Sequence, residues 1–167
     1  MTWRDTLWML VGTSLLLPTI ASAEKADSDK PMDVRALTMS SDQTRRISIF
    51  EGNATIVKGT LIIRADRIVI YQDEDGYTVA TATGKPARYR QKREGVDEYL
   101  EGEALTIVQD ERRDRLELRD QALFKRSQDQ IQGDAIEVDT RAEFYTVKSA
   151  KSGGRGRAVI QPRKDTE

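Results

Sequence analysis

One short pattern occurs three times in this chain and limits the fold more than any other feature. An apolar residue is followed two positions later by a small residue, then by an acid, and then by apolar residues five and seven positions after the first; the copies begin at Ile63, Leu100 and Ile131. Within each half the apolar residues alternate with polar ones, which is the period of a β-strand. The step at the acid interrupts this alternation, as a tight turn or a bulge does. Each copy therefore predicts strand, corner and strand, and the acids expected at the corners are Asp66, Glu103 and Asp134.

A second pattern lies between the copies of the first. It consists of residues typical of turns and bulges, flanked by alternating apolar residues, at Gly52-Asn53, Gly84-Lys85-Pro86 and Asp120-Gln121. Copies spaced roughly 30–40 residues apart are typical of stacked repeats, which form an elongated body with a continuous groove or core. The prediction is an all-β protein of antiparallel strands joined by short corners, and an ordinary β-sandwich is the alternative.

The first 23 residues have the features of a cleaved export signal. Arg4 precedes an apolar stretch that Pro18 interrupts, and Ala21-Ser22-Ala23 is a small-x-small cleavage site. The apolar stretch is shorter than the ~20 residues of a membrane span. We therefore interpret residues 1–23 as a signal peptide and residues 24–31 as a polar, disordered linker. The cleavage site and the absence of cysteine favour export to the periplasm, and secretion is the alternative.

Residues 32–150 are predicted to form the folded β domain, and residues 151–167 a basic, flexible tail. Residues 32–36 alternate and predict a first edge strand, and residues 159–160 predict a short last strand. Residues 110–118 are charged enough to suggest a helix, but the alternation of Leu116 and Leu118 with charged neighbours favours strand, turn and strand. Polar hairpin turns are expected near Gly59, Gly76, Gly95, Asp114 and Gln128.

The composition argues against catalysis, a metal site and a cofactor. The chain contains no His and no Cys, which removes the commonest general base, nucleophile and metal ligands. The recurring acids Asp66, Glu103 and Asp134 belong to structural repeats, so we expect them to cap turns by accepting backbone N–H groups. With 27 basic and 28 acidic residues, the chain lacks the basic surplus of a nucleic-acid binder.

The apolar residues of the strands are therefore the candidates for function. They would share one face of the sheet, which either fills a closed core or lines a lengthwise apolar cleft for acyl chains, because both arrangements bury the same kind of surface. The candidates for such a groove are Phe50, Ile56, Ile63, Ile68, Ile70, Leu105, Ile107, Leu118, Phe124, Ile136 and Val138.

The terminal strands are candidates for assembly, because an open stack leaves unpaired backbone groups at both ends that can extend the sheet into another molecule. We expect head-to-tail association of copies through two edges. The first edge comprises Met32, Val34 and Ala36, and the second comprises Tyr145, Val147 and Ser149.

The segment from Gly52 to Ile68 resembles the opening of the OstA-like domain family of lipopolysaccharide transport proteins. Gly84-Lys85-Pro86-Ala87 is similar to that family's second corner, and residues 131–136 are similar to its last repeat. The resemblance extends over about residues 32–160. It implies an open, twisted β-jellyroll with V-shaped antiparallel sheets.

The same resemblance implies a function, which is that of a periplasmic bridge that carries lipopolysaccharide from the inner to the outer membrane along an apolar groove. The implied partners are lipid A acyl chains, an inner-membrane anchored transport subunit, an outer-membrane translocon and further copies of the chain. Two alternatives remain open at this point. One is a membrane-anchored sister subunit of the same pathway, and the other is a structural module that binds only proteins and has a closed β core.

Cleavage is expected after Ala23, because the Ala21-Ser22-Ala23 site and the break at Pro18 are the features that signal peptidase recognises. The intact mass of the exported protein, measured by mass spectrometry, should match a chain that begins at Glu24. A mass that retains residues 1–23 would contradict cleavage and would favour the membrane-anchored alternative.

Overall fold

The computed structural model describes residues 27, 30–93, 95–142, 144–148 and 156–160. The predicted signal peptide and most of the predicted linker and tail lie outside these residues. Every regular element within them is a β-strand, and none of them belongs to a helix long and apolar enough to cross a membrane. The strands are β1 (Met32–Arg35), β2 (Thr38–Asp42), β3 (Ile47–Lys58), β4 (Leu61–Gln72), β5 (Thr78–Lys92), β6 (Tyr99–Asp110), β7 (Arg115–Arg126), β8 (Asp129–Asp139), β9 (Phe144–Lys148) and β10 (Arg157–Val159).

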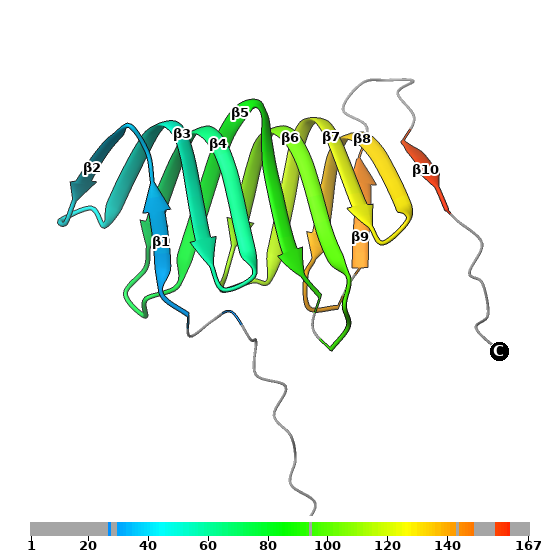
Figure 1. Ribbon diagram of the computed structural model, residues 1–167, viewed down its shortest axis with the longest axis horizontal. Coiled ribbons are helices and arrows are strands. Elements are labelled where there is room, and N and C mark those ends of the chain that lie inside the picture. Colours follow the sequence, from blue (N-terminus) through cyan, green and yellow to red (C-terminus); the bar gives the residue numbers. More distant parts are fainter. Residues whose placement is uncertain (1–26, 28–29, 94, 143, 149–155, 161–167) are drawn as a thin grey trace, which may run out of the picture.

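The strands form one antiparallel sheet that is not closed, which confirms the predicted all-β, open architecture (Figure 1). Strands β3 to β8 pair in chain order through hairpins, and the hairpin turns fall where the sequence predicts them. At one end β3 pairs with both β1 and β2, and at the other end β8 pairs with both β9 and β10. The predicted edge strand is thus confirmed over Met32–Arg35, as are the strands on both sides of residues 111–114. A short last strand is present, but it spans Arg157–Val159 and overlaps the predicted residues 159–160 only at Val159.

Every pair of neighbouring strands from β3 to β8 has one interruption of its register, near the middle of both strands. Each strand bends there, so the sheet folds over along one side, at the top of Figure 1. The bend divides the strands into two layers. Layer 1 contains β2, residues 47–51, 67–72, 78–83, 106–110, 115–119 and 135–139, and β9; layer 2 contains β1, residues 54–58, 61–65, 87–92, 99–104, 122–126 and 129–133, and β10.

The turn-like residues of the second sequence pattern form these bends. Gly52 and Asn53 are the two extra residues of β3 and have φ values of 82° and 48°, while Asp120 and Gln121 of β7 have φ values of 62° and 56°. These values lie in the left-handed region that a β-bulge uses. Gly52 also lacks room for a side chain, because a Cβ atom there would lie 2.7 Å from Leu37 Cδ1. In the second copy, Gly84-Lys85-Pro86, the peptide bond between Lys85 and Pro86 is cis.

The first sequence pattern also lies at the bends, but its second copy has the wrong phase. Asp66 of β4 and Asp134 of β8 are the unpaired residues opposite two-residue bulges, as predicted. In β6 the unpaired residue opposite the bend of β5 is Leu105, two positions after Glu103. The second copy still resembles the other two in sequence, although its bend lies two residues later. Side chains alternate between the two faces of a strand, so a shift of two residues leaves apolar and polar side chains on the same faces.

The capping role predicted for the acids was wrong for two of them. Glu103 pairs with the guanidinium of Arg88 on the neighbouring strand, with 3.3 Å between Arg88 Nε and Glu103 Oε1. Asp66 is exposed, and within the described part of the chain its carboxylate has no hydrogen-bond partner. Left-handed backbone and extra residues therefore make these bends without a carboxylate cap.

Small residues line the inside of the bend on every strand from β3 to β8. They pair across the sheet as Ala54 with Ala65, Ala87 with Ala104, and Ala122 with Gly133. The five alanines are buried. Because the two layers converge at the bend, a larger side chain there would meet the opposite layer.

The space between the layers is filled mainly by β-branched, leucine and aromatic side chains, each worth ~1.5–3 kcal/mol when buried. The inward side of Gly102 in layer 2 shows how closely the layers approach, because a Cβ atom there would lie 2.9 Å from Leu118 Cδ2 of layer 1. Phe124 of layer 2 lies against Tyr145 of layer 1, with ring centroids 6.3 Å apart. The largest fully buried side chains are Tyr89, Phe124, Ile56, Ile63, Ile68, Ile107, Leu116, Leu118, Ile131, Ile136 and Val138.

Replacing Ala104 by leucine should destabilise the fold by about 1–3 kcal/mol, because the side chain would overfill the inside of the bend. The matched control is Glu103→Leu, which places the same side chain one position earlier on the outer surface. That change removes the exposed pair with Arg88 and should cost less than ~1 kcal/mol. Urea denaturation would measure both free energies of unfolding. Equal losses would contradict the steric role of the small residues.

Candidate functional site

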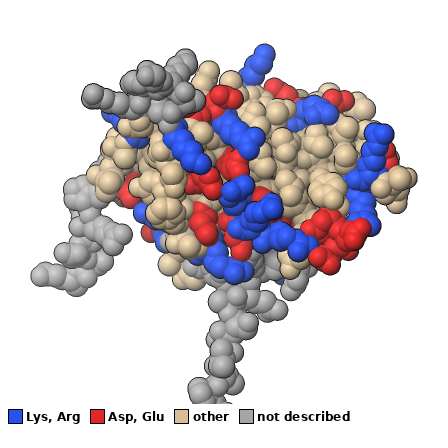
Figure 2. All heavy atoms as spheres, turned by 180° about the vertical axis from the view of Figure 1, so that it is seen from behind, with Lys and Arg blue, Asp and Glu red and all other residues tan. Residues whose placement is uncertain are grey.

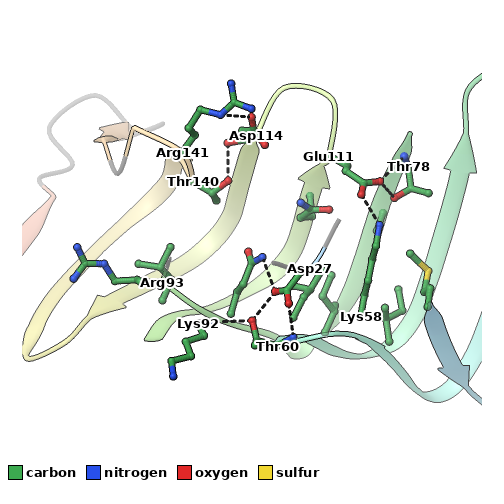
Figure 3. A pocket seen from close by; sticks show the side chains of 18 of the residues that line it. Asp27, Lys58, Thr60, Thr78, Lys92, Arg93, Glu111, Asp114, Thr140 and Arg141 are labelled. Atoms are coloured by element: carbon green, nitrogen blue, oxygen red, sulfur yellow. Dashed lines mark hydrogen bonds and ion pairs between the residues drawn. The ribbon is translucent and has the colours of Figure 1, made fainter. Parts of the chain in front are cut away.

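A cavity of about 870 Å³ lies on the side of the molecule opposite the bends, where the hairpin tips of the two layers face each other (Figure 3). Its lining comes from the ends of strands in both layers and from the turns between them. The apolar part of this lining consists of Met32, Ile56, Leu61, Ile63, Ala80, Val96 and Leu100. The molecule therefore has a groove that is closed along the bends and open along the hairpin tips.

Lys58 and Glu111 face each other across the open side of this groove. Lys58 is the last residue of β3 in layer 2, and Glu111 follows β6 in layer 1; Nζ and Oε1 are 2.5 Å apart. The other carboxylate oxygen, Oε2, accepts hydrogen bonds from the backbone N–H and the hydroxyl of Thr78, at 3.1 and 3.0 Å. Figure 3 shows the lysine side chain reaching up to the carboxylate.

The surroundings of Glu111 favour its charged form. Burial by itself raises the pKa of this carboxyl, but the hydrogen bonds from Lys58 and Thr78 outweigh it, so the pKa lies below its ordinary value of 4.5. Because the folded-state pKa is lowered, the stabilisation is present above pH ~4.5 and is lost as the pH falls through the folded-state pKa. At neutral pH both members of the pair are charged.

Asp27 occupies the middle of the groove mouth and is held by residues of layer 2. Its carboxylate accepts hydrogen bonds from Thr60 N at 2.8 Å, from Thr60 Oγ1 at 2.5 Å and from Gln91 Nε2 at 3.2 Å. Gln91 in turn accepts a hydrogen bond from the hydroxyl of the buried Tyr89. Burial, together with the charge of Asp27, strongly raises the pKa of Tyr89, so that its hydroxyl remains a donor.

The other cations around the mouth also have acidic partners, but each pair lies within one layer. Arg93 pairs with Glu98 and Lys92 with Asp97 in the turn between β5 and β6. On the opposite rim Arg141 Nε lies 3.2 Å from Asp114 Oδ2. The rim is therefore polar and charged, whereas the floor of the groove is apolar.

The charged groups of the rim described above are held by ion pairs or by hydrogen bonds to neutral side chains, and no group of three or more acidic residues in the described ranges lies close enough to hold a metal ion. Chemically, an apolar floor beneath a charged rim suits an amphipathic ligand whose apolar chains enter the groove while its polar part stays at the rim.

The predicted groove residues occupy three different places. Ile56 and Ile63 line the cavity. Phe50 is partly buried against the core, and Leu105 lies at the bend, where it lines a shallow depression on the outer surface with Lys85 and Gln121. The remaining candidates are buried between the layers and do not line the cavity, namely Ile68, Ile70, Ile107, Leu118, Phe124, Ile136 and Val138.

The sequence analysis missed the polar rim and part of the floor. Lys58 could have been found, because it continues the inward alternation of Ala54 and Ile56, and a lysine at an inward position needs a partner. No such signal marks Glu111 and Thr78 in the sequence, since their proximity to Lys58 depends on how the two layers face each other. Leu61 and Leu100 follow the same alternation but were left out of the candidate set.

The predicted assembly edges lie at opposite ends of the sheet. Met32 and Val34 belong to β1, Ala36 follows it, and all three are partly buried against the core. Tyr145 and Val147 of β9 are also partly buried, and Ser149 lies outside the described residues. Large apolar side chains are exposed near both ends, at Leu37 and Met39 and at Phe144 and Ile160.

Comparison with known proteins connects this architecture to a family. The family model described as "LptA/(LptD N-terminal domain) LPS transport protein" matches residues 33–144. The lipopolysaccharide export system protein LptH of Pseudomonas aeruginosa is 26% identical over the full length of both chains. The protein LptA of the same export system in Escherichia coli is 29% identical over 92% of this chain and 84% of its own.

A solved structure agrees with these relatives. The crystal structure of LptH from Pseudomonas aeruginosa, described as the LptA-homologous periplasmic component of the lipopolysaccharide transport device, superimposes with a TM-score of 0.76. It covers 82% of this chain and 99% of its own, with 25% sequence identity. These descriptions name a transport component, in agreement with the prediction that the chain is not an enzyme. The chain belongs to the LptA/LptD N-terminal domain family of lipopolysaccharide transport proteins.

Proposed function

We propose that this protein binds lipopolysaccharide in the periplasm and carries it towards the outer membrane, with the lipid A acyl chains in the groove between the layers. The observation that carries the proposal is the open groove of about 870 Å³, with an apolar floor and a charged rim, in a member of a lipopolysaccharide transport family. The periplasmic location is supported by the export signal in the sequence and by the description of the LptH structure as a periplasmic component.

The chemistry of the groove suits acyl chains. A methylene group transferred from water into an apolar environment gains ~0.8 kcal/mol, so several chains of lipid A together would supply a large binding free energy. The phosphate and sugar groups of the same molecule would remain at the rim, where Lys58, Lys92, Arg93 and Arg141 lie. A ligand that slides along the groove would keep this division between floor and rim.

The predicted groove residues that are buried between the layers could contact a ligand only if the two layers move apart. Ile68, Ile107 and Ile136 are fully buried and contact no open space, so acyl chains would reach them only if the layers separate along the open side. The layers are joined covalently along the bends, on the opposite side, and separation there is not required. We therefore propose that the groove widens when it is loaded, and that these three residues of layer 1 then exchange contacts with the facing layer 2 for contacts with the ligand.

End-to-end assembly would extend the groove beyond one molecule. Layer 1 ends in β2 and β9, and layer 2 ends in β1 and β10, so both layers have a free strand edge at each end of the described sheet. Pairing of β9 with β2 of the next copy would continue layer 1 without changing its strand spacing. We propose the same mode of contact for the inner-membrane subunit and the outer-membrane translocon, one at each end of a chain of copies.

A photo-crosslinking amino acid placed at Ile56 or Ile63 should capture lipopolysaccharide in cells, because both side chains line the groove. Val69 is the matched control: it is a similar side chain on β4 that alternates onto the outer face, and it should capture none. Immunoblotting for lipopolysaccharide on the purified protein would measure capture. Absence of capture at both groove positions would favour the alternative of a closed module that binds only proteins.

Cysteines introduced together at Ser40 and Thr146 should form intermolecular disulfides under mild oxidation and give a ladder of species larger than a dimer. Ser40 of β2 and Thr146 of β9 belong to the same lateral row of layer 1, so a continued sheet brings them close. The chain has no native cysteine, and each single variant provides the control because one cysteine can form only dimers. Non-reducing electrophoresis that shows no ladder for the double variant would contradict assembly through these edges.

A further inference from the structure

We infer that Lys58 and Glu111 form a latch that holds the two layers together across the open side of the groove and must separate before a ligand enters. The inference rests on the proposed function, because it concerns how the same groove admits its ligand. It assigns a positioning role to two residues that bind each other in the ligand-free protein. The family match and the named relatives do not assign this role.

The position of the pair is the first argument. The layers are connected covalently along the bends, so a contact at the hairpin tips acts at the greatest distance from that connection. The Nζ–Oε1 distance of 2.5 Å joins the end of β3 in layer 2 to the residue after β6 in layer 1. A single contact there limits the opening of the whole groove mouth beside it.

The second argument is that this pair differs from the other ion pairs. Among the ion pairs whose two partners are both described, every other one lies within a single layer or within one turn. The pair is also shielded, since the side chains of Lys58 and Glu111 are only 13% and 18% exposed. Shielding from water strengthens the attraction between the charges relative to an exposed pair.

The third argument is the asymmetry of the two partners. Glu111 is fixed to layer 1 by the two hydrogen bonds from Thr78, so its carboxylate keeps its place when the lysine leaves. Lys58 has a flexible four-carbon stem and no other partner among the described residues. When the pair separates, the Lys58 side chain therefore moves, whereas the Glu111 carboxylate stays bound to Thr78 and can accept the lysine again.

The floor of the groove explains why such a latch is useful. Ile56 and Ile63 lie directly beneath the mouth, and both are almost completely buried while the pair is formed. Holding the layers together keeps this apolar surface from water when no ligand is present. A ligand with acyl chains would cover the same surface after the latch separates, which removes the penalty for opening.

The width of the mouth can be measured directly because the chain has no native cysteine. Spin labels on Glu74→Cys and Val96→Cys report the distance between layers, since residue 74 is in an exposed turn of layer 1 and Val96 is exposed on the rim in layer 2. Glu111→Gln keeps the shape and the oxygen that Thr78 contacts but removes the charge. It should lengthen and broaden the distance distribution measured by double electron–electron resonance in the ligand-free protein.

Three further variants separate a latch from general loosening. Glu137→Gln removes an acid that pairs with Arg115 and Lys148 within layer 1, and it should leave the distance unchanged. Lys58→Met removes the other charge of the latch while it keeps a long stem, and it should widen the mouth as Glu111→Gln does. The reversed pair, Lys58→Glu with Glu111→Lys, should narrow the distribution again only in part, because a lysine at position 111 cannot accept the hydrogen bonds that Thr78 donates to Glu111.

The rate of ligand uptake tests the functional consequence. Fluorescently labelled lipopolysaccharide should associate about fivefold faster with the Glu111→Gln variant than with the wild type, equivalent to ~1 kcal/mol, and the reversed pair should return the rate towards wild type. Unchanged distances and unchanged rates in both single variants would overturn the latch while leaving the proposed function intact. A wild-type protein that binds no lipopolysaccharide would instead overturn the proposed function, and the ligand-free distances would still decide whether the latch exists.

Discussion

The structure depends on one constraint, which is that the register of every strand pair from β3 to β8 is interrupted near the middle of the strands, so that the bends lie side by side across the sheet. Left-handed residues such as Gly52, Asn53, Asp120 and Gln121 supply the extra length, and a row of alanines lets the bent strands approach each other. A single antiparallel sheet thereby becomes two facing layers without any crossover connection. Because the bends all lie on one side, the opposite side remains open, and the groove exists only because of this asymmetry.

Charge lies both on the outer faces and along the open side. Figure 2 shows basic and acidic residues spread over the face seen from behind. On the outer surface, pairs such as Arg88 with Glu103 join neighbouring strands. Apolar side chains between the layers gain free energy from burial, and the hairpin tips face water and carry polar residues. Asp27, Thr60 and Gln91 organise the rim of layer 2, whereas Lys58 and Glu111 connect the two rims. The closed ligand-free state is thus held by burial in the depth of the groove and by electrostatics at its mouth. A transport protein benefits from this division, since the contacts at the mouth can be exchanged without unfolding the bends.

The distinction between core and groove follows from the same geometry. Ile56 and Ile63 of layer 2 line the cavity, while Ile68, Ile107 and Ile136 of layer 1, each two positions after the unpaired residue of a bend, are buried and do not line it. All of them are apolar and face the space between the layers, so alternation along the strands alone does not separate them. If the layers separate as we propose, the boundary between core and groove moves with the opening angle, so one set of side chains would serve both purposes.

The sequence by itself determined the strands, their hairpins, the existence of the bends and the inward-facing residues, because these depend on alternation and turn chemistry between near neighbours. It placed Asp66 and Asp134 correctly at the bends but misplaced Glu103, since a slip of two residues leaves the alternation unchanged and only pairing with β5 reveals it. Tertiary structure alone decided that Leu105 lies on the outer surface and that Glu111 meets Lys58, which is 53 residues away in the chain. Contacts of that kind depend on how the two layers face each other, and no local pattern of residues records that arrangement.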